Sequence, residues 1–183
     1  MKIAYTISGL YNSGGMENIL LQKANYLSDV LGADITIITT DQDNRETFFQ
    51  VSPSINLVDL DINYFKFRKS KFWHIYKILL KRKHKRVLEN YLIENEFDIC
   101  VSLMDFDFAF LPLIKDRSIK IAEFHFSRYA KVYATKNKIK KICQYLRTFF
   151  WKRIIKKYDR FVVLTQQDKE QWGNMSNIVV IPN

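Results

Sequence analysis

The residues Gly9–Glu17 have the composition of an anion-binding loop, because three glycines and small polar residues separate two regular patterns. Residues 3–7 form an apolar run typical of a strand, and residues 16–31 repeat apolar positions at helical spacing. A helix N-terminus presents unpaired N–H groups and the positive end of its dipole, and glycine lets the backbone approach a ligand. A tight strand-to-helix turn without a ligand fits the same pattern, so the loop alone leaves both interpretations open.

The spacing of the glycines disfavours two common nucleotide sites. The loop reads G-x4-G-G and therefore lacks the G-x-G-x-x-G spacing of dinucleotide-binding loops. Gly15 and Met16 stand where a Walker loop needs Lys and Ser or Thr, which argues against a P-loop NTPase. Asp41 stands near the place of a ribose-binding acid, but Asp is common in such polar turns.

Polar residues also follow two later strand patterns. His125 comes directly after the pattern 119–124, where a histidine can hydrogen-bond a substrate hydroxyl or carry a proton. Ser102 and Asp105 come at the end of the pattern 98–103 and are candidate substrate-binding residues. Taken alone, His125 is better explained as a histidine satisfied by the core or exposed to solvent.

The remaining chemistry-bearing residues give little support to metal or thiol chemistry. The three histidines are scattered, and the sequence contains no HExxH, CxxC or G-x-S-x-G motif, so no metal site is expected. Cys100 and Cys143 lie inside a strand and a helix pattern, which predicts reduced, buried thiols in a cytosolic protein. No run of 18 apolar residues occurs, and the N-terminal run is too interrupted for a signal peptide.

The formal net charge of +10 is concentrated in two segments. Residues 66–86 hold ten Lys and Arg, residues 128–157 hold eleven, and neither segment contains Asp or Glu. Interleaved aromatic residues favour amphipathic helices on an anionic membrane surface, with a solvated face as the simpler alternative and nucleic acid as the least favoured. The cations predicted to face this surface are Lys66, Arg68, Lys69, Lys71, Lys81, Arg82, Lys83, Lys85 and Arg86.

Strand and helix patterns alternate along the chain, which predicts an α/β fold. Strands are expected at 2–7, 34–40, 55–60, 98–103, 119–124, 160–164 and 178–181, with a short strand-like run at 47–51. Helices are expected at 17–31, 71–96, 105–115, 137–158 and 166–172, and a loop at 63–70. In the helix 137–158 the expected inward face is Ile139, Ile142, Cys143, Leu146, Phe149, Phe150 and Ile154.

This order indicates a Rossmann-like, three-layer α/β/α domain with a mostly parallel sheet of about six or seven strands. In such sheets ligands bind at the carboxyl ends of the strands, near the point where the strand order reverses. The glycine loop, the segment 102–105 and His125 are therefore expected to converge on one edge of the sheet.

Four segments, taken in order, resemble family 4 glycosyltransferases. The first carries the family's Gly-Gly-x-Glu signature, the second its strand-end histidine, the third its Asp-Arg strand followed by an acidic helix, and the fourth its Ile-Pro-Asn turn. These segments are Ser13–Asn18, Ile121–His125, Tyr158–Lys169 and Asn177–Asn183. Asn18 departs from the arginine that often follows the signature Glu, which weakens any expectation of an anion contact there.

The resemblance implies a GT-B fold, in which two Rossmann-like domains enclose the active site. Residues 1–183 would be the N-terminal, acceptor-side domain, without the C-terminal donor-binding domain, and are expected to be inactive alone. The implied reaction moves a sugar, with retention, from a nucleotide-sugar to a membrane-associated glycan or lipid-linked acceptor. No metal or other cofactor is expected, and no nucleic acid partner.

The resemblance also implies roles for single residues. His125 would be the catalytic residue that hydrogen-bonds the transferred sugar or the developing charge. The backbone of Gly14 and Gly15 would lie against the donor diphosphate and the acceptor, with Glu17 in the first helical turn. The basic helix 65–86 would hold the protein peripherally on the cytoplasmic face of the membrane. The alternative is a Rossmann-like binding module whose basic helices contact nucleic acid or an acidic partner.

Overall fold

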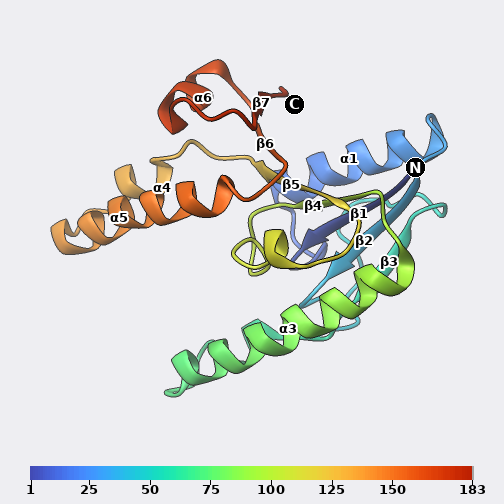
Figure 1. Cartoon of the computed structure of the whole chain (residues 1–183). Coiled ribbons are helices and arrows are strands. Elements are labelled where there is room, and N and C mark those ends of the chain that lie inside the picture. The colour runs from blue at the N-terminus through green and yellow to red at the C-terminus, as the bar shows by residue number, and fades with distance from the viewer. Residues whose placement is uncertain (183) are drawn as a thin grey trace.

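The computed structural model describes residues 1–182, with the backbone alone at position 131. Within them, seven strands form one parallel sheet in the order β3-β2-β1-β4-β5-β6-β7 (Figure 1). The strands are β1 (Lys2–Ile7), β2 (Asp34–Thr39), β3 (Asn56–Asp59), β4 (Ile99–Ser102), β5 (Ile119–Phe124), β6 (Arg160–Val163) and β7 (Ile178–Val180). The expected three-layer, Rossmann-like α/β architecture is confirmed.

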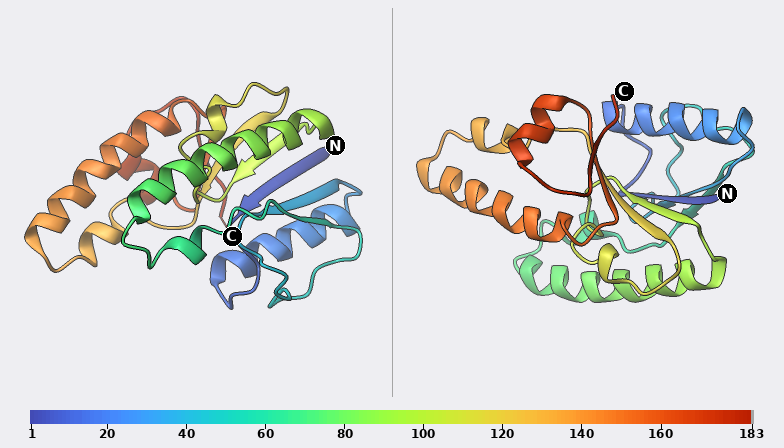
Figure 2. Two further views of the ribbon diagram at one scale, coloured as in Figure 1. Left: turned by 90° about the horizontal axis from the view of Figure 1, so that it is seen from below. Right: turned by 45° about the horizontal axis from the view of Figure 1, so that its top comes forward.

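Helices cover both faces of this sheet. They are α1 (Gly15–Asp29), α2 (Tyr64–Phe67), α3 (Trp73–Asn95), α4 (Ala130–Tyr133), α5 (Lys138–Ile155) and α6 (Gln166–Trp172), with a 3-10 turn η1 (Leu111–Leu113). In Figures 1 and 2, α1 lies on one face and α3 on the other. Both views also show α5 and α4 extending sideways beyond the sheet.

Consecutive strand residues point into two separate hydrophobic cores. Ile37 packs with Leu20 and Leu21 of α1, whereas the next residue, Ile38, packs with Leu88 of α3. Because side chains alternate across a strand, a strand with helices on both faces is apolar at nearly every position. The β-branched sequence Asp-Ile-Thr-Ile-Ile-Thr of β2 meets that requirement.

Three local expectations were wrong, and one short helix was not expected. Residues 47–51 form no strand, and the segment 105–115 is a series of turns around η1 rather than a helix. The expected loop 63–70 contains the short helix α2, and α4 had no pattern that predicted it. In each case the segment is short and held by turns, so its apolar residues show no clear helical or strand period.

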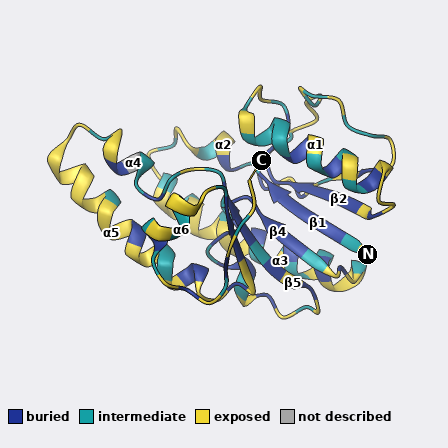
Figure 3. Ribbon diagram, turned by 90° about the horizontal axis from the view of Figure 1, so that it is seen from above, coloured by how far each residue is buried: buried dark blue, intermediate teal, exposed yellow. Residues whose placement is uncertain are grey.

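The face of α5 that periodicity placed inward is exposed over most of its length, as the yellow ribbon in Figure 3 shows. Ile139 is 74% exposed and Ile142 is 62% exposed, and Leu146, Phe149, Phe150 and Cys143 are exposed as well. Ile154 alone of the expected set is buried, beside Thr148 and Ile155. The first half of α5 lies beyond the sheet, so it has no core to pack against. The buried Cys100 agrees with its expectation, and Cys143 does not.

Two findings bear on membranes and metals. Within residues 1–182, the helices are too short or too polar to traverse a bilayer. The described side chains include no group of three His, Cys, Asp or Glu residues placed to hold a metal ion.

Candidate functional site at the carboxyl edge of the sheet

The strand order reverses at β1, which pairs with β2 on one side and with β4 on the other. Strand β5 follows β4, so the carboxyl ends of β1, β4 and β5 are neighbours. The glycine loop follows β1, Ser102–Asp105 follows β4 and His125 follows β5. The expected convergence on one edge of the sheet is therefore confirmed.

The glycine loop is held in place by the segment that follows β2. The Leu10 amide donates a hydrogen bond to Oε1 of Gln42 at 2.8 Å, and the carbonyl of Leu10 accepts one from the Phe48 amide at 2.8 Å. The Arg45 guanidinium lies 3.2 Å from the centre of the Tyr11 ring. These contacts hold Leu10 and Tyr11, near the start of the loop, against the segment that follows β2.

The two glycines at the start of α1 differ in what surrounds them. Gly14 is the N-cap, and a Cβ placed there would collide with the Glu17 carboxylate. Glu17 thus folds back to the helix N-terminus, where a negative charge is stabilised by the helix dipole. Gly15 is exposed, and a Cβ placed there would meet nothing within 4 Å. The protein's own packing does not require glycine at position 15, and the backbone there is open to a ligand.

The imidazole of His125 is oriented by an acidic partner. Its Nε2 lies 3.0 Å from Oε1 of Glu123, and the same carboxylate pairs with Lys23 of α1. Burial raises the pKa of Glu123, but the hydrogen bond from His125 and the charge of Lys23 outweigh burial and lower it. Glu123 is therefore ionised and accepts a hydrogen bond from the Nε2–H of His125.

The second ring nitrogen is the atom available for chemistry. Within the described residues Nδ1 of His125 has no hydrogen-bond partner, and the side chain is 5% exposed. The sequence neighbours Phe124, Phe126, Ser127 and Arg128 line a pocket of about 280 Å³.

Ser102 does not face the edge as expected but lies beneath it. The residue is 0% exposed, and its hydroxyl bonds Asp107, as does that of Thr6 at 2.8 Å. Burial raises the pKa of Asp107 to about 6, although these hydrogen bonds work in the opposite direction. The sequence analysis missed Asp107, for which the signal was an acid enclosed by aromatic residues in Asp105–Phe108.

Asp105 stays closer to the surface and lines a pocket of about 420 Å³ between α3 and α5. The two basic segments, far apart in sequence, lie on either side of this pocket, and Figure 2 shows the two helices side by side. Its cations are Lys77 and Lys81 of α3 and Arg147 of α5. None of these three was among the residues predicted to bind substrate, although Lys81 was predicted to face an anionic surface.

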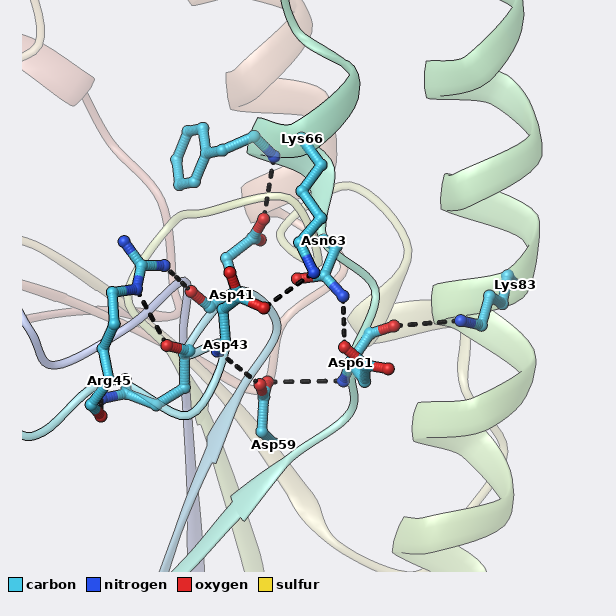
Figure 4. A network of polar contacts seen from close by, with 10 residues as sticks. Asp41, Asp43, Arg45, Asp59, Asp61, Asn63, Lys66 and Lys83 are labelled. Atoms are coloured by element: carbon cyan, nitrogen blue, oxygen red, sulfur yellow. Dashed lines mark hydrogen bonds and ion pairs between the residues drawn. The ribbon is translucent and has the colours of Figure 1, made fainter.

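Two cations predicted to face an anionic surface also contact acidic loops of the protein, as Figure 4 shows. Lys66 pairs with Asp43 at 2.7 Å, and Lys83 donates to the Asp61 carbonyl at 3.0 Å. Asp59 accepts from the amides of Asp43 and Asp61 and joins the two loops. Arg68, Lys69, Lys71, Lys81, Arg82 and Arg86 are exposed, and Lys85 is half-buried.

Residues 13–183 match the sequence profile of Glycosyltransferase Family 4. The chain belongs to this glycosyltransferase family. No match was found among curated proteins. The match includes the Gly-Gly-x-Glu signature, the strand-end histidine and the C-terminal turn, so it covers each segment on which the resemblance rested.

Solved glycosyltransferases share the fold. Sucrose-phosphate synthase from Thermosynechococcus elongatus is 13% identical with a TM-score of 0.70, over 99% of this family 4 chain and 47% of that protein. The lipopolysaccharide outer core galactosyltransferase WaaB is 16% identical with a TM-score of 0.63, over 100% of this chain and 46% of WaaB. The chain thus spans about half the length of these GT-B proteins, and at such identities the likeness establishes the fold alone.

Proposed function

We propose that the chain is the acceptor-side part of a retaining glycosyltransferase. It would move a sugar from a nucleotide-sugar to a membrane-associated glycan or a lipid-linked acceptor, in the synthesis of a cell-surface polysaccharide or lipopolysaccharide. The observation that carries the proposal is His125, whose imidazole is oriented by Glu123 at the same edge of the sheet as the open Gly15 backbone. The name of WaaB, a lipopolysaccharide galactosyltransferase, supports the acceptor class.

Each residue at this edge would have a distinct task. Nδ1 of His125 would accept a hydrogen bond from a hydroxyl of the transferred sugar and so fix its orientation. The N–H groups at Gly14 and Gly15 and the dipole of α1 would stabilise charge on the donor diphosphate. Because Glu17 lies at the same helix end, its carboxylate would move aside when the diphosphate binds. We propose that this chemistry needs no metal ion.

Docking to the membrane is a second part of the proposal. The first half of α3 exposes Phe72, Ile75, Ile78 and Leu79 next to exposed cations. Apolar side chains flanked by Lys and Arg suit the headgroup region of an anionic leaflet. The protein would therefore act in the cytoplasm, peripherally attached to the inner face of the membrane.

The catalytic assignment is tested by sugar transfer in the longest natural polypeptide that contains these 183 residues. His125→Ala and Gly15→Val are each expected to lower turnover by roughly a hundredfold. His74→Ala is the matched control, since that histidine is exposed on α3. Circular dichroism confirms that the variants fold. Turnover within twofold of wild type for both test variants would refute the assignment.

The 183 residues alone are proposed to bind acceptor without completing transfer. They span less than half of sucrose-phosphate synthase and of WaaB, and leaving-group charge would be stabilised largely by groups outside them. Parallel assays of residues 1–183 and of the longer polypeptide therefore separate binding from catalysis.

A further inference from the structure

The pocket between α3 and α5 has the composition of a site for an amphiphilic anion. It opens beside the residues that follow β4, including Met104, Asp105 and Phe106, and thus lies at the same edge of the sheet as the proposed catalytic residues. Aromatic side chains form much of its wall, namely Tyr64, Phe106, Phe108, Phe150 and Trp151.

Three cations line this pocket, together with the carboxylate of Asp105. Within residues 1–182, Lys77, Lys81 and Arg147 form no ion pair within 4.0 Å of a carboxylate. Partial burial lowers the pKa of Lys81, and the charge of Lys77 lowers it further. Arg147 lies 4.8 Å from the centre of the Trp151 ring, which holds its charge at the pocket wall. Cations that repel one another in this way are stabilised by a bound anion.

An apolar surface continues from the pocket along α5. Phe150 lines both the cationic pocket and a neighbouring depression of about 430 Å³. The apolar part of that depression also includes Leu146 and Phe149, and its remaining lining residues are Lys152, Arg153 and Lys156. Ile142, one helical turn before Leu146, is 62% exposed and extends the same apolar surface. A ligand with an anionic head and a hydrocarbon chain would contact both surfaces at once.

We propose that the phosphate of an amphiphilic acceptor, of the isoprenoid phosphate class, binds between Lys77, Lys81 and Arg147, with its hydrocarbon chain along Leu146 and Phe150. This inference rests on the proposed glycosyl transfer only in calling the ligand an acceptor. Trp151 lines both this pocket and the pocket formed by Phe124 and Phe126, which are the sequence neighbours of His125.

Calorimetry on residues 1–183 tests the binding half without any nucleotide-sugar. Farnesyl phosphate, below the concentration at which it forms micelles, is compared with farnesol and with glucose 1-phosphate. Wild type is expected to bind farnesyl phosphate at least tenfold more tightly than either of the other two. Equal affinity for glucose 1-phosphate, or for farnesol, would refute an amphiphilic ligand.

Variants assign the binding to this pocket. The triple variant Lys77→Gln, Lys81→Gln and Arg147→Gln is expected to bind at least tenfold more weakly. Its matched control, Lys138→Gln, Lys140→Gln and Lys141→Gln, removes the same charge from the exposed first half of α5 and should bind like wild type. Leu146→Ser removes an exposed apolar group and should weaken binding of farnesyl phosphate by severalfold. Equal loss in the two triple variants would refute the pocket.

Failure here and failure of the proposed function give different results. Transfer by the longer polypeptide that is unaffected by the pocket variants refutes the pocket and leaves the glycosyltransferase assignment intact. Pocket-dependent binding without transfer to any acceptor refutes the proposed function and leaves the binding site.

Discussion

Two buried carboxylates near the proposed site respond to pH in opposite directions, because their surroundings differ. Asp107 has neutral hydroxyl partners, so burial dominates and raises its pKa. Glu123 has a cation, Lys23, and a histidine as partners, which lower its pKa in spite of burial. Ionisation of Asp107 therefore destabilises the folded state, whereas ionisation of Glu123 stabilises it.

Asp107→Asn is expected to flatten the dependence of stability on pH. The folded pKa of about 6 exceeds the ordinary Asp pKa of 3.8, so the contribution of Asp107 is fully present below pH 4 and is lost as pH rises through 6. The loss amounts to about 3 kcal/mol. Asn keeps an oxygen for Thr6 without a charge, so the variant should gain stability relative to wild type at pH 8 but not at pH 4. Urea unfolding at both pH values measures this.

Glu123→Gln is the comparison that fixes the sign of the Asp107 effect. The contribution of Glu123 is present above its unfolded pKa and is lost as pH falls through its lowered folded value. Its variant should therefore be less stable than wild type at pH 8, with the difference shrinking toward acid. If the stability of both variants relative to wild type changed with pH in the same direction, the local partners would not explain the pH dependence of the two carboxylates.

At the level of single residues, the sequence located His125 because strand-end chemistry depends on local order. It could not locate Asp107 or the cations of the pocket in the same way. Asp107 meets Thr6 across 101 residues, and Arg147 shares the pocket with Lys77 of another helix. Contacts between distant segments depend on packing, which periodicity does not specify.

Helix α5 shows where periodicity misleads at the level of an element. Its apolar residues are regularly spaced. Such spacing predicts that one face of the helix packs against an apolar surface, but it does not identify that surface. In this chain the sheet covers Ile154 and Ile155, whereas Ile139 and Ile142 are uncovered. The second half of α5 is therefore better packed than the first half, and its local stability should be higher.

Hydrogen exchange should detect this division. Residues 138–147 include no buried side chain and are expected to exchange faster than residues 148–155. The N-cap Asn137 accepts a hydrogen bond from the Lys140 amide at 3.0 Å, and Asn137→Ala removes it. The loss of about 1 kcal/mol should speed exchange in the first half of α5 by roughly fivefold. Thr165→Ala, which removes the corresponding cap of α6, should leave α5 unchanged. Uniform exchange along α5 would contradict this account.

At the scale of the whole molecule, the sequence predicted the fold well because a parallel sheet has long-range rules. Apolar strands buried on both faces and right-handed crossovers leave few topologies for an alternating chain. All seven strands were located, and the edge where β1, β4 and β5 end followed from their order. The charge pattern was less informative, since it did not predict that both basic segments line one pocket.

Charge is unevenly distributed over the molecule, and this distribution predicts binding to anionic membranes. The basic helices lie together while the rest of the chain holds eight basic and nineteen acidic residues, so one side should bind anionic surfaces. Co-sedimentation should show binding to vesicles containing phosphatidylglycerol but not to neutral vesicles. Binding should weaken at least tenfold between 50 and 300 mM salt, because surface charges are screened.

A charge-matched pair of variants assigns this binding to α3 and the segment before it. Arg68→Gln, Lys69→Gln and Lys71→Gln remove exposed cations that have no structural partner among the acidic loops, unlike Lys66 and Lys83. This variant should lose most vesicle binding, because each basic residue near the surface contributes about 1 kcal/mol. Lys115→Gln, Arg117→Gln and Arg160→Gln remove the same net charge elsewhere and should bind like wild type. Equal losses in both variants would indicate attraction by net charge alone.

Tighter binding to single-stranded RNA than to the anionic vesicles would instead favour a nucleic-acid-binding module over a membrane-docked glycosyltransferase.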